Sequence, residues 1–137
     1  MTSTGVEWTT VPGAVRAVVA MSRSGAEAYV VDGAGIEDLP SWVREFSAHV
    51  PLDPPLVSGH SLDAISDSLF GGLADRGDSE LVILWTSADV LRDRDAPTYQ
   101  AVIAVLEDVV SQLRQPRPRG AEANLRVFLV PSSRSET

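Results

Sequence analysis

The chain has 137 residues, no cysteine and a formal net charge of −8. This length accommodates one domain with a single hydrophobic core, and the lack of cysteine excludes disulfide frameworks, thiolate metal sites and cysteine nucleophiles. No apolar run approaches the length of a transmembrane helix, and no signal-peptide pattern opens the chain. We therefore expect a cytoplasmic protein without membrane association.

The acidic charge is concentrated in the middle of the chain. Residues 27–80 contain eleven acidic residues and two arginines, which gives this segment a charge of −9, whereas five arginines follow residue 113. An acidic surface repels nucleic-acid phosphates and attracts basic proteins. Acidic composition is also common for solubility alone. The charge thus favours a basic protein partner, and we expect no direct binding to nucleic acid.

Residues 1–26 are interpreted as an N-terminal extension. Pro12 predicts the start of a short helix, which Gly25 closes. The apolar residues of this helix are Val15, Val18, Val19 and Met21. We expect the helix to pack on the domain that follows.

Residues 27–131 predict one α/β domain, followed by a polar tail at residues 132–137. Continuous apolar runs indicate three buried strands, at residues 28–32, 80–85 and 125–130. Helical spacing of apolar residues predicts helices at 38–50, 61–72 and 97–114 and a short helical turn at 87–92, capped by Ser87. Strands alternating with helices favour a small three-stranded parallel sheet packed with about four helices.

The predicted helix at 61–72 has an apolar side and a polar end. Leu62, Ile65 and Leu69 recur at helical spacing and predict a buried stripe. Ser61 is placed to cap the first turn. Gly71-Gly72 is expected to end the helix.

Two carboxylates lie on the outward side of the same helix. Asp63 and Asp67 are four residues apart, so they stack on one face, and like charges at this spacing weaken a helix. The positive helix N-terminus accounts for Asp63, but its effect fades within the first turn and does not account for Asp67. Two interpretations remain open: a solvated face, or a binding face for a cationic partner.

Candidate catalytic and metal-binding motifs are incomplete. Gly33-Ala34-Gly35 follows a strand, but an aspartate occupies the position of the third glycine of a dinucleotide-binding motif. Gly59-His60-Ser61 lacks both the closing glycine and the preceding strand of a nucleophile elbow. His49 and His60 are the only histidines, too few to suggest a metal site. We expect no catalytic residue, metal or cofactor.

The order of elements and a set of specific residues carry a family resemblance over residues 28–131. The central helix reads Leu-Asp-Ala-x-x-Asp-x-Leu, from Leu62 to Leu69. The other matching positions are Val31-Asp32-Gly33, Ile36, Pro55, Gly59, Gly71, Val82-Ile83-Leu84-Trp85 and Val127-Phe128-Leu129-Val130. In these features the chain resembles the barstar family of intracellular ribonuclease inhibitors.

The resemblance implies inhibition by binding, with helix carboxylates standing in for RNA phosphate in the active site of a nuclease. Carried over to this chain, Asp67 would mimic the phosphate and Asp63 would support it. The implied partner is a small secreted or toxin ribonuclease with a basic active site, bound by a monomer in a 1:1 complex. The remaining implied contact residues are Val57, Gly59, Ser61, Leu62, Ser66, Phe70, Gly71 and, on the long helix, Asp108.

The chain also departs from the best-known member of that family. Aromatic residues of that member's contact surface are replaced here by Val57, Ser58, Ser66 and Gly72. Aromatic anchors usually carry much of an interface's binding energy, so a related guanyl-specific microbial ribonuclease fits better than barnase itself. A barstar-like interaction module with a partner that is not a ribonuclease is the alternative, and a small α/β enzyme is the third hypothesis.

Overall fold

Strands and helices alternate along the chain in a computed structural model that describes residues 5–56, 61–74, 80–115 and 123–132. The elements in chain order are β1 (Val6–Trp8), α1 (Val11–Arg23), β2 (Glu27–Asp32), α2 (Leu39–His49), α3 (Leu62–Ala74), β3 (Glu80–Thr86), α4 (Asp89–Arg94), α5 (Ala96–Arg114) and β4 (Asn124–Val130). No helix in these ranges has the length and apolarity needed to cross a membrane.

The strands form one sheet in the order β1-β4-β3-β2, and every neighbouring pair is parallel. The α/β class and the parallel sheet are confirmed, but the prediction of three strands is wrong: β1 adds a fourth, pairing with residues 127–129 of β4. β1 has only three residues, Val6–Trp8, and a run that short shows no periodicity by which a strand can be recognised.

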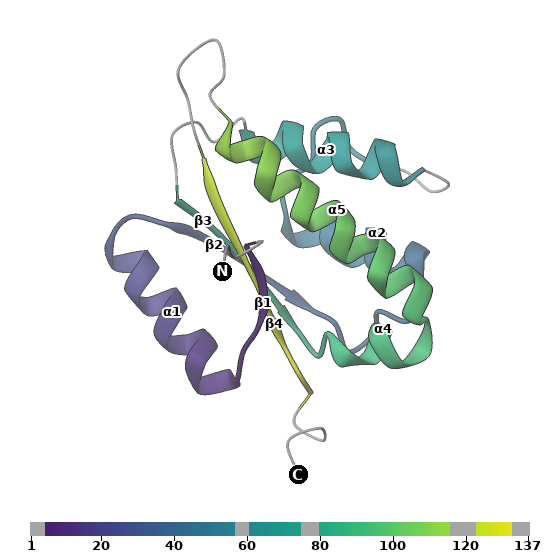
Figure 1. Ribbon diagram of the computed structural model, residues 1–137, viewed down its shortest axis with the longest axis horizontal. Helices are drawn as coiled ribbons and strands as arrows, with labels where there is room; N and C mark the ends of the chain where they lie inside the picture. Colours follow the sequence, from purple (N-terminus) through teal and green to yellow (C-terminus); the bar gives the residue numbers. More distant parts are fainter. Residues whose placement is uncertain (1–4, 57–60, 75–79, 116–122, 133–137) are drawn as a thin grey trace.

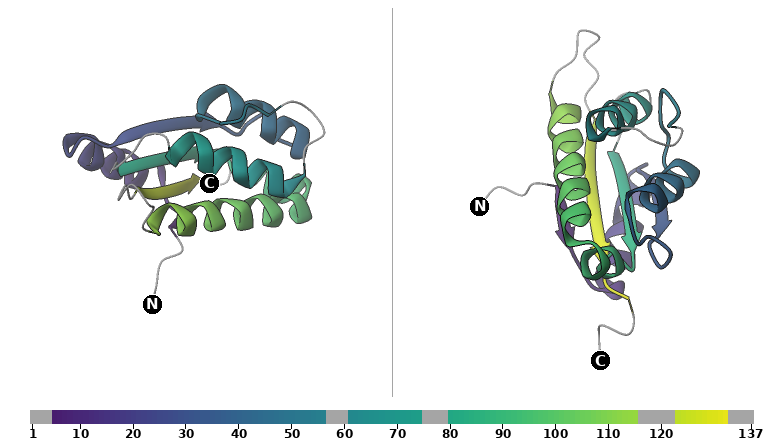
Figure 2. Two further views of the ribbon diagram at one scale, coloured as in Figure 1. Left: turned by 90° about the horizontal axis from the view of Figure 1, so that it is seen from above. Right: turned by 90° about the vertical axis from the view of Figure 1, so that its right-hand side faces the viewer.

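The helices are divided unequally between the two faces of the sheet. α1 lies on one face, and α2, α3, α4 and α5 lie on the other (Figure 1). Seen from above, α3 runs between α2 and α5 (Figure 2), and α3 and α5 are in close contact. The main core fills the space between this four-helix layer and the sheet. Its largest side chains include Trp42, Trp85, Phe46, Ile65, Leu69, Leu106 and Leu113.

Most helices match their predicted positions, with corrections at their ends. Asp38 caps α2 as predicted and accepts a 2.9 Å hydrogen bond from the Ser41 amide. The Ser41 hydroxyl also donates a 2.6 Å hydrogen bond to the Asp38 carboxylate, and these two hydrogen bonds, the hydroxyl's above all, lower the pKa of the Asp38 carboxyl. Ser87 does not cap α4; it has a positive φ of 53°, and the helix starts after Ala88 without a side-chain cap. Asp95, which the prediction overlooked, caps α5.

The predicted end of α3 is wrong. Helix α3 continues through Gly71 and Gly72 to Ala74. The segment that joins α2 to α3 crosses the helix here: a Cβ at Gly71 would lie 2.1 Å from the Asp53 carbonyl oxygen, and one at Gly72 would lie 2.1 Å from the Pro51 carbonyl oxygen. These glycines let a backbone segment approach the helix closely, and they do not stop it.

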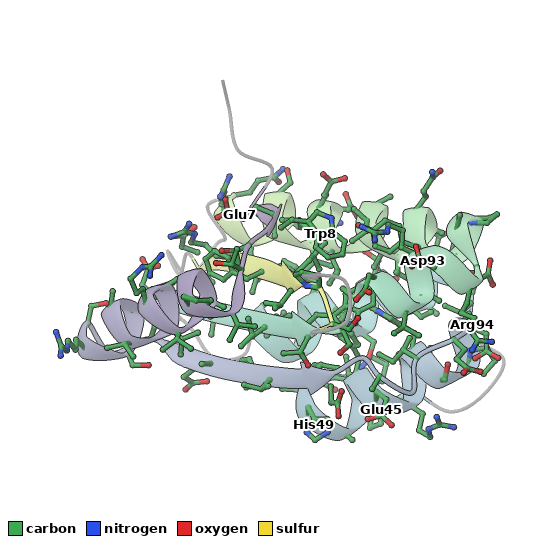
Figure 3. All side chains as sticks on the ribbon, turned by 90° about the horizontal axis from the view of Figure 1, so that it is seen from below. Glu7, Trp8, Glu45, His49, Asp93 and Arg94 are labelled. Atoms are coloured by element: carbon green, nitrogen blue, oxygen red, sulfur yellow. The ribbon has the colours of Figure 1, made fainter. Side chains whose placement is uncertain are left out.

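An aromatic cluster packs the N-terminal extension against the domain. From β1, Trp8 extends towards α4 and α5 (Figure 3), where its indole N–H donates a 3.1 Å hydrogen bond to the Tyr99 hydroxyl. The Arg92 guanidinium lies 4.8 Å from the centre of the Trp8 ring, a cation–π contact. Trp8 thereby joins β1 to the four-helix layer.

Replacing Trp8 with alanine is expected to lower the free energy of unfolding by about 1–2 kcal/mol, because the hydrogen bond, the ring contact and the cation–π contact are all lost. Urea denaturation followed by circular dichroism measures this effect. Tyr99→Phe is the matched control, since it keeps the ring and loses only the hydroxyl, and it should cost about 1 kcal/mol or less. Unchanged stability of Trp8→Ala would show that this cluster does not anchor β1.

Candidate partner-binding site

One side of α3 carries four of the residues implied by the resemblance. Asp63, Ser66, Asp67 and Phe70 follow the spacing i, i+3, i+4, i+7, which places them on one stripe of the helix. Both aspartates are exposed, Phe70 is partly buried against the core, and Ser66 is buried. We call this stripe, together with Asp108, the acidic face of α3.

Asp108 joins this face from α5. Its Oδ2 atom accepts a 3.2 Å hydrogen bond from the Ser66 hydroxyl and a 2.8 Å hydrogen bond from the Gln112 side-chain amide. Ser66 belongs to the stripe of α3 that carries Asp63 and Asp67, so its hydrogen bond holds the Asp108 carboxylate next to that stripe. The structure thus brings three exposed carboxylates together on two packed helices.

The three carboxylates have no ionic partner in the part of the chain that the structure describes. The ion pairs found there join Arg44 to Glu45, His49 to Glu45, Arg92 to Asp93 and Arg126 to Glu7. None of them neutralises Asp63, Asp67 or Asp108. An ionised carboxylate accepts hydrogen bonds and donates none, so this surface is suited to binding a cationic group from outside.

The start of α3 is built by Ser61 and Leu62. The Ser61 hydroxyl accepts a 3.2 Å hydrogen bond from the Ala64 amide, which confirms the predicted cap. Leu62 was expected in the buried stripe, and that prediction is wrong: Leu62 is 38% exposed, whereas Ile65 and Leu69 are fully buried. Leu62 is the first residue of α3 and lies one turn before the buried Ile65. Its exposed side chain places an apolar group beside Asp63.

Gly71 follows Asp67 by one helical turn, and the segment after α2 covers it. The Asp53 amide donates a 3.0 Å hydrogen bond to the Ser68 carbonyl, and the Ser68 hydroxyl donates to the Pro54 carbonyl. Gly71 therefore borders the aspartate stripe on the side that this segment covers. Gly72 is buried in the same contact, so no aromatic side chain fits at that position. Val57 and Gly59 lie outside the described residues.

Gln112 is a residue that sequence reasoning missed. It lies four residues after Asp108 on α5, a spacing at which an amide can bond to a carboxylate on the helix surface, and this was the available signal. The contact between Ser66 and Asp108 joins residues 42 positions apart. No sequence pattern within either helix indicates such a contact.

Around this site the described residues show no cluster of metal-ligand side chains. Within the described ranges, no group of three or more histidine, aspartate and glutamate side chains is arranged to hold a metal ion. His49 ends α2 and lies 4.0 Å from the Glu45 carboxylate on the outer surface of that helix (Figure 3). Asp63 and Asp67 project from a convex helix, so they do not enclose a substrate.

Comparison with known proteins places this geometry in a family. The family model described as Barstar (barnase inhibitor) matches residues 26–130. No curated protein and no solved structure matches the chain. The matched segment runs from β2 to the end of β4, so it includes the whole acidic face of α3 and omits β1 and α1.

Proposed function

The chain belongs to the barstar family, and on that premise we propose that it inhibits a small microbial ribonuclease of the guanyl-specific type. In this proposal the acidic face of α3 enters the nuclease active site, with Asp67 in place of an RNA phosphate and Asp63 as its supporting contact. The inhibitor acts in the cytoplasm and protects the producing cell from a secreted or toxin ribonuclease. Each chain binds one nuclease molecule.

The observation that carries this proposal is the set of three exposed carboxylates on α3 and α5 that have no ion pair among the described residues. A nuclease active site must stabilise the charge of RNA phosphate, so it presents cationic groups. Hydrogen bonds between arginine and carboxylate are strong and geometrically specific. Asp67 and Asp63 are one helical turn apart, which lets adjacent cationic groups on the nuclease meet adjacent carboxylates.

Two apolar side chains border the carboxylates and offer contacts around them. Leu62 is 38% exposed at the start of α3, and Phe70 is partly buried at the end of the stripe. These residues are candidates for the apolar part of an interface that lacks the family's usual aromatic anchors. The position between the aspartates, Ser66, is committed to holding Asp108. A nuclease that binds this surface therefore depends more on charged contacts than a nuclease whose inhibitor has an aromatic anchor at this position.

Calorimetric titration of this protein into a small guanyl-specific ribonuclease, with RNA cleavage measured in parallel, tests the proposal. Binding at one nuclease per chain with loss of cleavage supports it. Binding without inhibition would contradict an active-site mechanism. Failure to bind any ribonuclease of this type would favour a basic partner that is not a ribonuclease.

Changing Asp108 to asparagine is expected to slow association with the nuclease and to weaken the dependence of the association rate on salt. Asp108 lies at the edge of the face, and edge charges act mainly on the association rate. Stopped-flow mixing at several salt concentrations measures both quantities. Asparagine keeps a side-chain oxygen that accepts from Ser66 and Gln112, so the local contact is preserved. An unchanged rate and salt slope would remove Asp108 from the interface.

A second candidate is a barstar-like interaction module whose basic partner is not a ribonuclease. The observation that favours it is Ser66, which is buried and hydrogen-bonded to Asp108 where the best-known family member has an aromatic residue. The acidic face would bind a cationic surface in the same way, but RNA cleavage would not be affected. The paired binding and cleavage measurements above distinguish the two candidates.

A further inference from the structure

Asp108 differs from the two aspartates of α3 in the way its carboxylate is held. Its Oδ2 atom accepts two hydrogen bonds, at 3.2 Å from the Ser66 hydroxyl and at 2.8 Å from the Gln112 side-chain amide. In the part of the chain that the structure describes, no hydrogen bond reaches the side chain of Asp63 or Asp67. All three carboxylates are exposed, but the protein itself orients only that of Asp108.

The two donors to Asp108 belong to different helices. Gln112 lies one turn after Asp108 on α5, which is an ordinary pairing distance on a helix surface. Ser66 lies on α3, which packs beside α5 (Figure 1), and its side chain is only 8% exposed. A single donor on the same helix would let the carboxylate turn about its Cα–Cβ bond. The second donor, on a neighbouring helix, restricts the carboxylate to one orientation.

Both hydrogen bonds end on the same oxygen of Asp108. A carboxylate has about two acceptor positions on each oxygen, so the two donors occupy those of Oδ2. Within the described residues, Oδ1 accepts no hydrogen bond. One oxygen therefore anchors the side chain, while the other is held in a fixed place and stays available to a group from outside.

On the premise of the proposed inhibition, we infer that Ser66 and Gln112 are positioning residues of the acidic face of α3. They act through Asp108, because they hold its Oδ2 atom and so fix the place of Oδ1. A cationic group of the nuclease contacts Oδ1 through one N–H donor. A two-pronged contact with an arginine, which needs both oxygens of one carboxylate, is left to the aspartates of α3.

Positioning and charge affect different rate constants. The attraction that steers the nuclease towards the surface depends on charge, and neither Ser66 nor Gln112 is charged. A hydrogen bond in the complex depends on the orientation of Asp108, and a side chain that is ordered beforehand loses less conformational entropy on binding. The loss of positioning is therefore expected in the dissociation rate, whereas the loss of the Asp108 charge is expected mainly in the association rate.

NMR spectroscopy of the free protein tests the positioning itself. Three-bond coupling constants across the Cα–Cβ bond of Asp108 should report one rotamer in the unaltered protein. They should report an average of several rotamers in the double variant Ser66→Ala/Gln112→Met. Alanine and methionine side chains lack hydrogen-bond donors, and both residues favour helix, so the fold should be retained. An averaged rotamer in the unaltered protein, or an unchanged rotamer in the double variant, would overturn the inference.

Stopped-flow kinetics with a small guanyl-specific ribonuclease test the consequence for binding. Ser66→Ala and Gln112→Met should each raise the dissociation rate by about three- to tenfold and leave the association rate and its salt dependence unchanged. Gln100→Met is the matched control, since it makes the same change at an exposed position about two turns before Asp108 on α5. It should alter neither rate. Equal effects of Gln100→Met and Gln112→Met would overturn the inference.

Asp108→Ala separates positioning from a purely structural role of the two donors. If they act through Asp108, neither Ser66→Ala nor Gln112→Met should raise the dissociation rate further in the Asp108→Ala variant. Effects that persist in that variant would show that the donors act on helix packing, and would overturn the inference. If the unaltered chain binds no ribonuclease of this type, the proposed function fails, and the coupling constants of Asp108 alone decide whether Ser66 and Gln112 position it.

Discussion

Replacing Asp67 with alanine is expected to abolish inhibition of the nuclease without changing the fold. Asp67 is exposed on α3 and has no hydrogen bond or ion pair within the described residues, so the isolated protein loses no contact. In the complex, removing one partner of a buried charge pair costs about 2–5 kcal/mol. That range corresponds to a rise in the dissociation constant of roughly 30-fold or more.

Titration calorimetry with the nuclease, alongside RNA cleavage, measures the effect of Asp67→Ala. Asp93→Ala is the matched control: it removes the same charge from an exposed aspartate on α4 (Figure 3) and should leave inhibition intact. If the two variants weaken binding equally, only net charge matters and the acidic face of α3 is not the contact. Full inhibition by Asp67→Ala would exclude the phosphate-mimic mechanism.

Asp63→Ala helps to separate the two roles assigned to the aspartates. Asp63 lies in the first turn of α3, where a carboxylate stabilises the helix by typically 0.3–1 kcal/mol. Its replacement therefore weakens both stability and binding, whereas Asp67→Ala weakens binding without loss of stability, because it relieves the like-charge repulsion within α3. The double variant shows whether the aspartates act together, because neighbouring residues that bind the same groups have non-additive effects.

The stripe that holds the candidate site could be predicted from sequence because it belongs to one helix. Helical spacing alone places Asp63 and Asp67 on the same side of α3, and the structure confirms this arrangement. Asp108 was expected only through the family resemblance. Its hydrogen bond from Ser66 depends on how α3 packs against α5, and periodicity within one helix carries no information about the packing of another.

The fold was predictable where elements are long and was missed where they are short. The apolar runs of β2, β3 and β4 and the periodicity of α1 and α5 are strong local signals. β1 has three residues, and its strand conformation depends on pairing with β4 and on the contact of Trp8 with Tyr99. Tertiary contacts decide the conformation of such a segment, so composition and spacing could not reveal it.

Gly71 and Gly72 show how one residue type can have two structural causes. Glycine is favoured just after a helix because it tolerates a left-handed conformation, and it is also favoured where a second backbone segment comes very close. Both causes select glycine, so the residue type alone does not distinguish them. The structure distinguishes them, because α3 continues past both glycines while the segment at residues 51–53 lies against them.

Gly72→Ala separates these two causes by the sign of its effect on stability. Inside a helix, alanine is favoured over glycine by about 1 kcal/mol, so propensity alone predicts a more stable protein. A Cβ at residue 72 would lie 2.1 Å from the carbonyl oxygen and 2.4 Å from the carbonyl carbon of Pro51. These are backbone atoms, which cannot rotate away as a side chain can, so the clash outweighs propensity. We expect a net loss of about 1–3 kcal/mol in the free energy of unfolding, measured by urea denaturation.

Gly35→Ala is the control, since a Cβ there meets no atom within 4 Å, and the stability of this variant should be nearly unchanged. A Gly72→Ala variant more stable than the unaltered protein would show that the segment after α2 does not press on α3.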